Sequence, residues 1–578
     1  MGGGRAHYAV VAVREQNDAS ERLLAALHRE MGRLLGVPVA LQRFSPCLAA
    51  LTGPPTPRLA VTQERLRPAD EGERLTNLAR RLRAPPDPGD GWCWREDAQS
   101  VVVCNDRLGM RPLWLCAPRG ACVVTTLPIA AARAAGLSLD PGAARMLVFA
   151  DYIMGDRGMF ARTRVLPGGT LVIADSHGQV HVERYWDPKW GVGTRRPRPE
   201  DLEHAHRLFQ EGLRTYCPPG KTVALELTAG HDSRTVLAGL LLVGHPPDLA
   251  ITLGGIKEAD EQGGRSLAER CRIPHCVVAR WPADLAQHQA DAEALAVHTN
   301  CERAVWFYAC DVMMSRYLSG RYDTCLHGKL GELFRGRGGI RGRYSDPDPG
   351  KEATSDAQRL IWVMMPWGWE WLQANVPDAC RQVGTDLEEA AEELLATYGD
   401  VDDVWARADL VFLDQRLRRF AANPAVERER WHEYPMPLAY PPLVDFLLQF
   451  CGEHNVHAPF ARSLIAKARL PALPRYRRPC ASEWSPRWVW EGLRRRAARL
   501  APQRPGTGPE VPKASRLTSV DRTVLRRAQE LARSSPLACD CLNAAAQRLT
   551  TAPPDALSAF EQGLICRAAS IALIEGLL

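Results

Sequence analysis

The chain has no apolar run long enough to cross a membrane as a helix. Its longest apolar stretches, residues 236–243 and the mostly apolar residues 568–578, fall far short of the roughly 20 residues that such a helix needs. The first residues also lack the charged segment followed by an apolar segment that marks a secretory leader. We therefore expect a cytoplasmic protein with no membrane partner.

The cysteines are not clustered, and lysines are few. The 17 cysteines contain no Cys-x-x-Cys pair, and the closest two, Cys539 and Cys541, have no His or Cys cluster beside them. This spacing argues against a zinc site or a disulfide framework and favours reduced cysteines in the core. Only seven of the 73 basic residues are lysine, so a mechanism that needs an ammonium group has few candidates. The net charge of +6 over 578 residues is too dilute to indicate a nucleic-acid partner.

Residues 1–187 predict an α+β domain with antiparallel sheets. Short β-branched runs such as YAVVAV and ACVVTTL alternate with turns there, and helical spacing occurs at residues 19–36 and 140–153. The stretch at 188–200 is rich in proline, glycine and arginine, which predicts a linker and a domain boundary.

Residues 201–480 predict a second domain of a different class. Strands such as TVALEL and DLAITL alternate with single helices, which indicates right-handed βαβ units and a parallel sheet, and the later part of this stretch is mainly helical. Residues 481–578 predict a helical carboxyl-terminal extension. Ligands of parallel sheets bind beyond the carboxyl ends of the strands. The candidate functional residues therefore fall at 228–233, 254–255 and 327–332.

The junction TAGHDS at residues 228–233 joins the first strand of that sheet to a helix. A strand that turns directly into a helix leaves backbone N–H groups at the positive end of the helix dipole, which suits phosphate. Gly230 permits a tight turn, Asp232 and Ser233 can cap the helix, and Asp232 can also hold a divalent cation. An ordinary N-cap explains the same residues equally well, so the junction alone leaves both interpretations open.

The stretch TAGHDS resembles the pyrophosphate loop, Ser-Gly-Gly-x-Asp-Ser, of the ATP-pyrophosphatases that include the asparagine synthetase family, with Thr228 and Ala229 as departures. The stretch CLHGKLGELFRGR at residues 325–337 resembles that family's later loop, in which Gly331 stands where the family has a metal-binding Asp and Glu332 is kept. The segments NDRLGMRPLW and ERYWDP, both before residue 189, resemble the glutaminase-like domain of the same enzymes.

The resemblance implies a fold and a chemistry. The fold is an Ntn-hydrolase-like α+β domain of the class II amidotransferase type, followed by an α/β PP-loop ATP-pyrophosphatase domain with a helical carboxyl-terminal part. The chemistry is that of an AMP-forming ligase, which uses ATP and Mg²⁺ to activate a carboxylate by adenylation and then forms an amide bond with an amine.

The resemblance also implies roles for individual residues. The expected nucleotide-binding residues are Thr228, Ala229, Gly230, Asp232, Ser233 and Gly254, with Gly255 beside them, and the expected metal ligands are Asp232 and Glu332. Because Gly331 removes one carboxylate, we expect Mg²⁺ to arrive with the nucleotide, and we expect Gly331→Asp to lower the magnesium concentration that activity needs.

Lys467 and Glu332 are the expected catalytic residues. Lys467 resembles a lysine that the family carries after a Pro-rich segment, although a solvated helix face explains it as well, and Lys329 is a competing cation. His231 and His327 flank the phosphate site, either as a base for the amine or as structural hydrogen-bonding residues.

The related glutaminase domains use a cysteine at the mature terminus as nucleophile, whereas this sequence begins Met1-Gly2 and its first cysteine is Cys47. We therefore expect no ammonia release from glutamine, a loss shared with the β-lactam synthetases and lasso-peptide cyclases. This favours small-molecule or peptide carboxylate and amine substrates in natural-product or peptide modification. Two alternatives stay open, namely asparagine biosynthesis from free ammonia and a degenerate homologue that binds a nucleotide or a partner without catalysis. The oligomeric state is open, with a homodimer as one alternative.

Overall fold

The computed structural model of this chain describes residues 7–52, 91–95, 100–193, 195–254, 258–281, 284–331, 357–358, 360–361, 373–450, 458–470 and 520–578. Its amino-terminal part contains two antiparallel sheets. A six-stranded sheet has the order β2-β3-β1-β7-β6-β8, with bounds Ala40–Ser45, Leu48–Thr52, Tyr8–Val13, Ala121–Thr125, Trp114–Cys116 and Thr163–Val165. A four-stranded sheet has the order β10-β9-β5-β4, with bounds Val180–Arg184, Thr170–Asp175, Ser100–Cys104 and Gly91–Arg95. The prediction of antiparallel sheets is confirmed.

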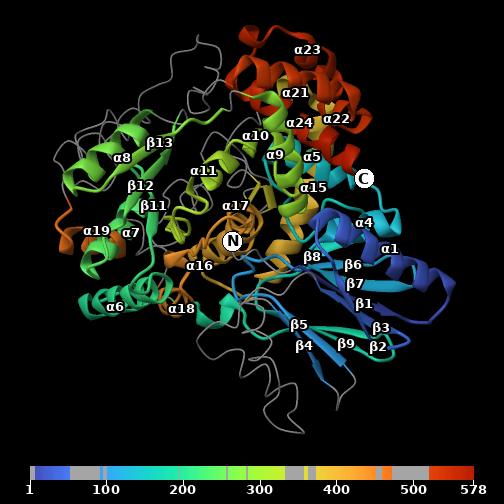
Figure 1. Cartoon of the computed structure of the whole chain (residues 1–578), viewed down its shortest axis with the longest axis horizontal. Helices are drawn as coiled ribbons and strands as arrows, with labels where there is room; N and C mark the ends of the chain where they lie inside the picture. Colours follow the sequence, from blue (N-terminus) through green and yellow to red (C-terminus); the bar gives the residue numbers. More distant parts are fainter. Residues whose placement is uncertain are drawn as a thin grey trace.

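Alternation along β1 explains how these sheets pack. Val10 and Ala12 point to one face and join the buried cluster that includes Val101 and Val103 of β5. Alternate residues of β1, such as Val11, join the cluster on the other face. There the helices α1 (Asp18–Leu35) and α4 (Pro128–Ala135) cover the six-stranded sheet (Figure 1). The predicted helices at 19–36 and 140–153 correspond to α1 and to α5 (Pro141–Ala150).

The predicted linker at 188–200 is packed against a later part of the chain. It begins with a 3-10 turn, η1 (Pro188–Gly191), and ends where α6 (Pro199–Tyr216) begins. Between them, the amide of Gly193 donates to the carbonyl oxygen of Leu448 at 3.1 Å, and the Arg195 guanidinium lies 4.5 Å from the centre of the Phe450 ring. The segment therefore joins the two parts of the chain through contacts of its own.

The second part contains the predicted parallel sheet. Its order is β13-β12-β11-β14, with bounds His275–Val278, Leu249–Leu253, Val223–Glu226 and Thr324–Leu326, and every pair is parallel. Its strands are mostly apolar, and β11, β12 and β14 are almost entirely buried, as expected for strands covered on both faces. The helices α7 (His231–Leu242) and α8 (Glu258–Arg270) follow β11 and β12, while α6, α18 (Pro441–Leu447) and α19 (Pro459–Lys467) pack beside α7 or α6.

The remainder of the described chain is helical. It comprises α9 (Leu285–His298), α10 (Val305–Tyr308), α11 (Asp311–Leu318), α15 (Pro377–Thr397), α16 (Val404–Val411), the π-helix η3 (Phe412–Ala421), α17 (Ala422–Arg428), the 3-10 turn η4 (Pro437–Ala439), α21 (Arg522–Ser534), α22 (Pro536–Leu542), the 3-10 turn η6 (Asn543–Ala545), α23 (Ala546–Thr551), the 3-10 turn η7 (Pro554–Ala556) and α24 (Ala559–Leu577). Among the described helices, none has the length and apolar character to cross a membrane.

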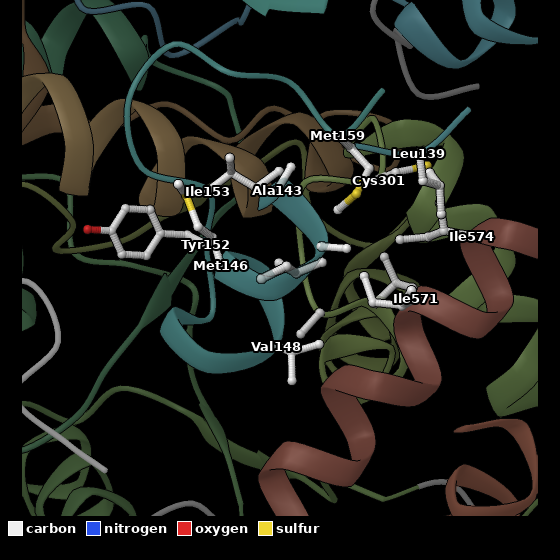
Figure 2. Packing of buried hydrophobic residues seen from close by; sticks show 14 of the residues in the cluster. Leu139, Ala143, Met146, Val148, Tyr152, Ile153, Met159, Cys301, Ile571 and Ile574 are labelled. Atoms are coloured by element: carbon white, nitrogen blue, oxygen red, sulfur yellow. The ribbon is translucent and has the colours of Figure 1, made fainter. Parts of the chain in front are cut away.

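The carboxyl-terminal helices pack on the amino-terminal part of the chain. The buried side chains of Ile571 and Ile574 on α24 turn toward α5, and Val148 of α5 lies in the same cluster (Figure 2). The prediction of a helical extension is confirmed for residues 520–578, and the rest of the range 481–578 lies outside the described residues. The extension shares one buried apolar cluster with α5 and so contributes to the stability of the amino-terminal part.

Candidate functional site

The junction between β11 and α7 is closed by its own side chains. The hydroxyl of Thr228 accepts the amide N–H of Gly230 at 3.1 Å and lies 3.1 Å from the hydroxyl of Ser233. Ser233, which is buried, in turn accepts the amide N–H of Thr228 at 3.2 Å. Gly230 is the N-cap of α7 and supplies no side-chain cap. The small residues and hydroxyls of TAGHDS therefore build a compact strand-to-helix turn, as both interpretations of the sequence require.

The loop after β14 lies directly against this turn. β11 and β14 are neighbouring parallel strands, with Leu225 opposite Leu326. A Cβ atom added to Gly328 would lie 2.5 Å from the amide nitrogen of Ser233, and one added to Gly331 would lie 2.4 Å from Oδ1 of Asp232. The two stretches that the sequence assigned to one site are thus adjacent, and both glycines are needed for the close approach.

This contact revises the expectation for Gly331→Asp. Any side chain at position 331 would overlap the Asp232 carboxylate, and an Asp there would also place two negative charges together. A second metal-binding carboxylate cannot be added at this position without moving Asp232 or the loop. The expected gain in magnesium affinity therefore does not follow from the geometry.

We predict that Gly331→Ala displaces the Asp232 carboxylate and lowers stability by about 1–3 kcal/mol, because the added methyl group overpacks a buried contact. Thermal or urea denaturation measures the loss. Gly576→Ala is the matched control, since a Cβ atom at Gly576 in α24 meets nothing within 4 Å. Equal stabilities for the two variants would contradict the close packing of Gly331 on Asp232.

Two further glycines hold the turn, and sequence reasoning missed them. Gly263 and Gly264 lie inside α8, where a Cβ atom on Gly263 would lie 2.5 Å from Cβ of Ala229 and one on Gly264 would lie 2.6 Å from the carbonyl oxygen of Leu227. A Gly-Gly pair inside a helical pattern was the available signal, because such a pair weakens a helix unless close packing requires it.

The other predicted site residues have different surroundings. Gly254 follows β12, donates its amide to the carbonyl oxygen of Val278 at 2.8 Å, and has no room for a side chain because Val277 lies beside it. Packing against β13 thus explains this glycine without a ligand. Glu332 and Gly255 lie outside the described residues. The nucleotide, metal and catalytic roles of these residues stay predictions.

The two candidate lysines are placed differently. Lys467 ends α19, and its ammonium group pairs with the Glu203 carboxylate on α6 at 2.7 Å, with both side chains about half exposed. Lys329 lies in the loop that meets Asp232, and its ammonium group is 5.3 Å from the centre of the Tyr434 ring. The structure therefore places Lys329 in the loop that contacts the junction, whereas Lys467 makes a surface ion pair.

A buried polar cluster, formed by Glu226, His327, Arg428 and Tyr434, lies behind the second loop. The Tyr434 hydroxyl donates to Oε1 of Glu226 at 2.6 Å, and Arg428 contacts both of these groups. The His327 ring stacks on the Tyr434 ring with centroids 4.2 Å apart. Sequence reasoning found only His327, because the contacts of Glu226 with Tyr434 and Arg428 join residues far apart in the chain. A charged Glu226 at the end of an apolar strand was the one local signal.

His327 is held as a neutral imidazole. Burial, followed by the charge of Lys329, lowers the pKa of His327 well below its ordinary value of 6.5. Its Nδ1 accepts the amide N–H of Lys329 at 3.1 Å, so the ring proton is assigned to Nε2. His327 can therefore donate a hydrogen bond through Nε2, and the role of base through Nδ1 is not supported by this arrangement.

His432 beside this cluster predicts a pH-dependent stability. Burial, aided by Arg428, lowers the pKa of His432 to about 4 from 6.5. In the unfolded chain His432 takes up a proton as the pH falls through 6.5, whereas in the folded chain it stays neutral down to about pH 4. The free energy of unfolding is therefore unaffected by His432 above pH 6.5 and decreases as the pH falls from 6.5 toward 4. We expect His432→Gln to reduce the pH dependence of the free energy of unfolding in this window, by on the order of 1–3 kcal/mol.

Urea denaturation at several pH values measures this effect. His181→Gln is the control, because His181 is exposed on β10 and its substitution should leave the slope unchanged. If the free energy of unfolding of His432→Gln depends on pH as steeply as that of the unmodified chain, His432 is not buried in its neutral form.

The amino-terminal part also contacts the segment that carries this cluster. The guanidinium of Arg111 forks onto the carboxylate of Glu429, with N–O distances of 2.7 and 3.1 Å. Asp106 fixes the loop before Arg111 by accepting the amide N–H groups of Met110 and Arg111 at 2.9 and 2.8 Å. Glu429 follows Arg428 directly, so the amino-terminal part holds one wall of the candidate site.

Metal ligands are sparse in the described part of the site. Across the described residues, no group of three or more His, Cys, Asp or Glu side chains is placed to hold a metal ion. Asp232 is the carboxylate that the described parts of the two loops contribute, and its role as a metal ligand stays a prediction.

No protein-family model matches the chain, and no curated protein matches it. One solved structure that does match is the glutamine phosphoribosylpyrophosphate amidotransferase from B. subtilis complexed with ADP and GMP. The match has 10% identity and a TM-score of 0.16, and it covers 47% of this chain and 65% of that one, so this chain spans less than two thirds of that structure. At that TM-score the likeness carries no argument about activity.

Proposed function

We propose that the protein is an ATP-dependent, AMP-forming ligase of the asparagine synthetase type, which joins a small-molecule or peptide carboxylate to an amine. The single observation that carries the proposal is the meeting of two distant motifs. TAGHDS follows β11 and the described part of the second motif, residues 327–331, follows β14, and Gly331 of the second motif packs on Asp232 of the first. A ligand site beyond the carboxyl ends of parallel strands needs this adjacency.

The described residues fit a nucleotide with its magnesium ion. α7 is 12 residues long and begins at the turn without a side-chain cap, so its amino end can take negatively charged phosphate. Thr228, Gly230 and Ser233 would line the phosphates, and Asp232 would hold the ion together with phosphate oxygens. Magnesium bound there would neutralise charge on the leaving pyrophosphate.

The proposed reaction has two steps. A carboxylate oxygen of the substrate attacks the α-phosphorus of ATP, and the bond to the bridging oxygen breaks so that pyrophosphate leaves. An amine then attacks the activated carbonyl carbon, AMP leaves, and the amine gives up a proton. The chain's contribution is to bind and orient the phosphates and to exclude water from the activated acyl group.

One observation favours a non-catalytic homologue instead. The hydroxyls of Thr228 and Ser233 already bind one another and the amides of Gly230 and Thr228, so the turn explains these two side chains without a ligand. In that case the protein would bind a nucleotide or a partner without turning it over.

Exchange of labelled pyrophosphate into ATP separates the two proposals. The exchange requires a reversible adenylation step, so a ligase will show it only when its carboxylate substrate is present. A panel of amino acids, small dicarboxylates and peptide carboxylates is the probe. Saturable nucleotide binding without exchange across the panel, measured by calorimetry, would favour the non-catalytic homologue.

A further inference from the structure

Two open hollows adjoin on the outer surface of the amino-terminal part. The helix-side hollow, of about 760 Å³, runs along α1 and the end of α4. The strand-side hollow, of about 820 Å³, lies between the ends of β1 and β7 and the turn before β10. They share Pro118, Gly120 and Ala121, so a single loop separates them. Together they form one continuous surface, which we call the double hollow.

The lining of the double hollow is strongly basic. Exposed arginines line both parts: Arg22, Arg29, Arg119 and Arg162 in the helix-side hollow, and Arg14 in the strand-side hollow. His177 and His181 also line the strand-side hollow. Among the described residues of the two linings, Glu15 is the single acidic one. The surface therefore carries a concentrated positive charge although the whole chain is only weakly basic.

These five arginines differ from their neighbours in having no protein partner. Within the described residues, none of their side chains makes a hydrogen bond or an ion pair, whereas Arg33 and Arg43 close by pair with Glu30 and Glu21. Among the other arginine side chains described between residues 7 and 187, only Arg164 shares this property. Unpaired guanidinium groups gathered around a concavity repel one another and attract an anion.

The walls of the double hollow are fixed turns. Gly120 adopts a positive φ of 73°, and the amide of Ala121 donates to the carbonyl oxygen of Pro118 at 3.2 Å. On the opposite wall, the side chain of Asp175 accepts the amides of His177 and Gln179 at 2.9 and 2.8 Å. A preformed surface of this kind loses little conformational entropy when a ligand binds.

The spacing and chemistry of the lining indicate the ligand. Arg22 and Arg29 are seven residues apart on α1, which separates them by about 10 Å along one helix face. Leu23, Ala26 and Leu137 line the same hollow as these charges and offer apolar contact. Guanidinium forks match carboxylates, and an extended peptide with several acidic side chains supplies both the charges and the aliphatic stems.

We propose that the double hollow is a docking site for an acidic peptide segment of a substrate or partner protein. A single-stranded nucleic acid fits less well, because among the described residues that line either hollow there is no Phe, Tyr or Trp to stack on bases. The site is separate from the Asp232 turn in its residues, so the proposal does not depend on the ligase function.

Fluorescence anisotropy with fluorescein-labelled hexaglutamate and the full chain tests this proposal. We expect saturable binding that weakens as NaCl rises from 50 to 200 mM, and no binding of hexaglutamine. The triple variant Arg22→Gln/Arg29→Gln/Arg119→Gln should weaken binding at least about tenfold, because several charge-assisted hydrogen bonds are lost. Asp232→Asn should leave binding unchanged.

The matched control is Arg196→Gln/Arg214→Gln/Arg526→Gln, which removes the same charge from exposed arginines outside the double hollow. It should stay within about twofold of the unmodified chain. Absence of hexaglutamate binding, or equal weakening by both triple variants, would overturn the proposal. Two other results would also replace it: tighter binding of labelled dT12 that the first triple variant removes, or displacement of hexaglutamate by inorganic pyrophosphate at equal charge concentration.

Discussion

Asp232→Asn will reduce ATP–pyrophosphate exchange by at least about 100-fold while the folded structure is kept. Asn preserves the size of the side chain and one acceptor oxygen but removes the negative charge that would hold a magnesium ion beside the phosphates. Loss of one preorganised electrostatic contact to a developing charge commonly costs 10²–10³ in rate. The cost in stability should stay near about 1 kcal/mol, because Asp232 lies in the first turn of α7 and Asn can replace it there.

Asp248→Asn is the control for this experiment. Asp248 accepts the amide N–H of Val223 at 2.7 Å, at the amino end of β11, whereas Asp232 lies beyond its carboxyl end. Both substitutions remove one carboxylate charge beside the same strand, but only Asp232 faces the second loop. If ATP–pyrophosphate exchange in Asp232→Asn stays within about twofold of the unmodified chain, TAGHDS is an ordinary strand-to-helix turn and not a nucleotide site.

The parallel sheet was predictable because its signal is local. TVALEL, DLAITL and HCVV are short apolar runs that each precede or follow a helical pattern, and all of them became strands of one sheet. The ends of those strands were predictable for the same reason, since the position of a loop in a βαβ unit follows from the order of its elements. This is why both candidate loops could be assigned to one edge before their contact was seen.

The contacts across the site were not predictable, because they depend on distant residues. Tyr434 and Glu226 are more than two hundred positions apart in the chain, and no local pattern near either residue predicts their hydrogen bond. Lys467 was chosen as a catalytic candidate from the family resemblance alone. That resemblance could not predict that its ammonium group pairs with Glu203. The packing of α24 on α5 likewise joins helices that are distant in the sequence, through apolar side chains whose pattern does not specify the partner helix.

The π-helix η3 buries charged side chains that its sequence alone does not mark as buried. The run FLDQRLRRFA has the composition of a surface helix, yet Arg418 and Arg419 are only 1% and 2% exposed. Arg419 donates to the carbonyl oxygens of Ile153 and Arg157 at 3.0 and 2.7 Å. A charged residue can be buried at this interface only because the amino-terminal part supplies acceptors for it.

Arg418→Met will lower the free energy of unfolding by about 3–5 kcal/mol. The Arg418 guanidinium contacts the Asp414 carboxylate at 2.9 Å, the Asp156 carboxylate at 2.8 Å and the carbonyl oxygen of Leu166 at 3.2 Å. Met fills a similar volume but leaves two carboxylates without their cation, and breaking a buried ion pair from one side is strongly destabilising. Urea denaturation measures the loss.

Arg416→Met separates the buried charges from the effect of the side chain's size. Arg416 lies two positions earlier on the same helix, with its guanidinium 3.8 Å from the centre of the Phe420 ring, so its replacement should cost about 1 kcal/mol or less. Adding Asp414→Leu to Arg418→Met should recover part of the loss, because it removes one of the stranded carboxylates. Similar losses for Arg416→Met and Arg418→Met, or no recovery in the double variant, would mean that apolar packing holds η3 to the amino-terminal part. In that case the three-way contact of Arg418 would contribute little to joining the two parts.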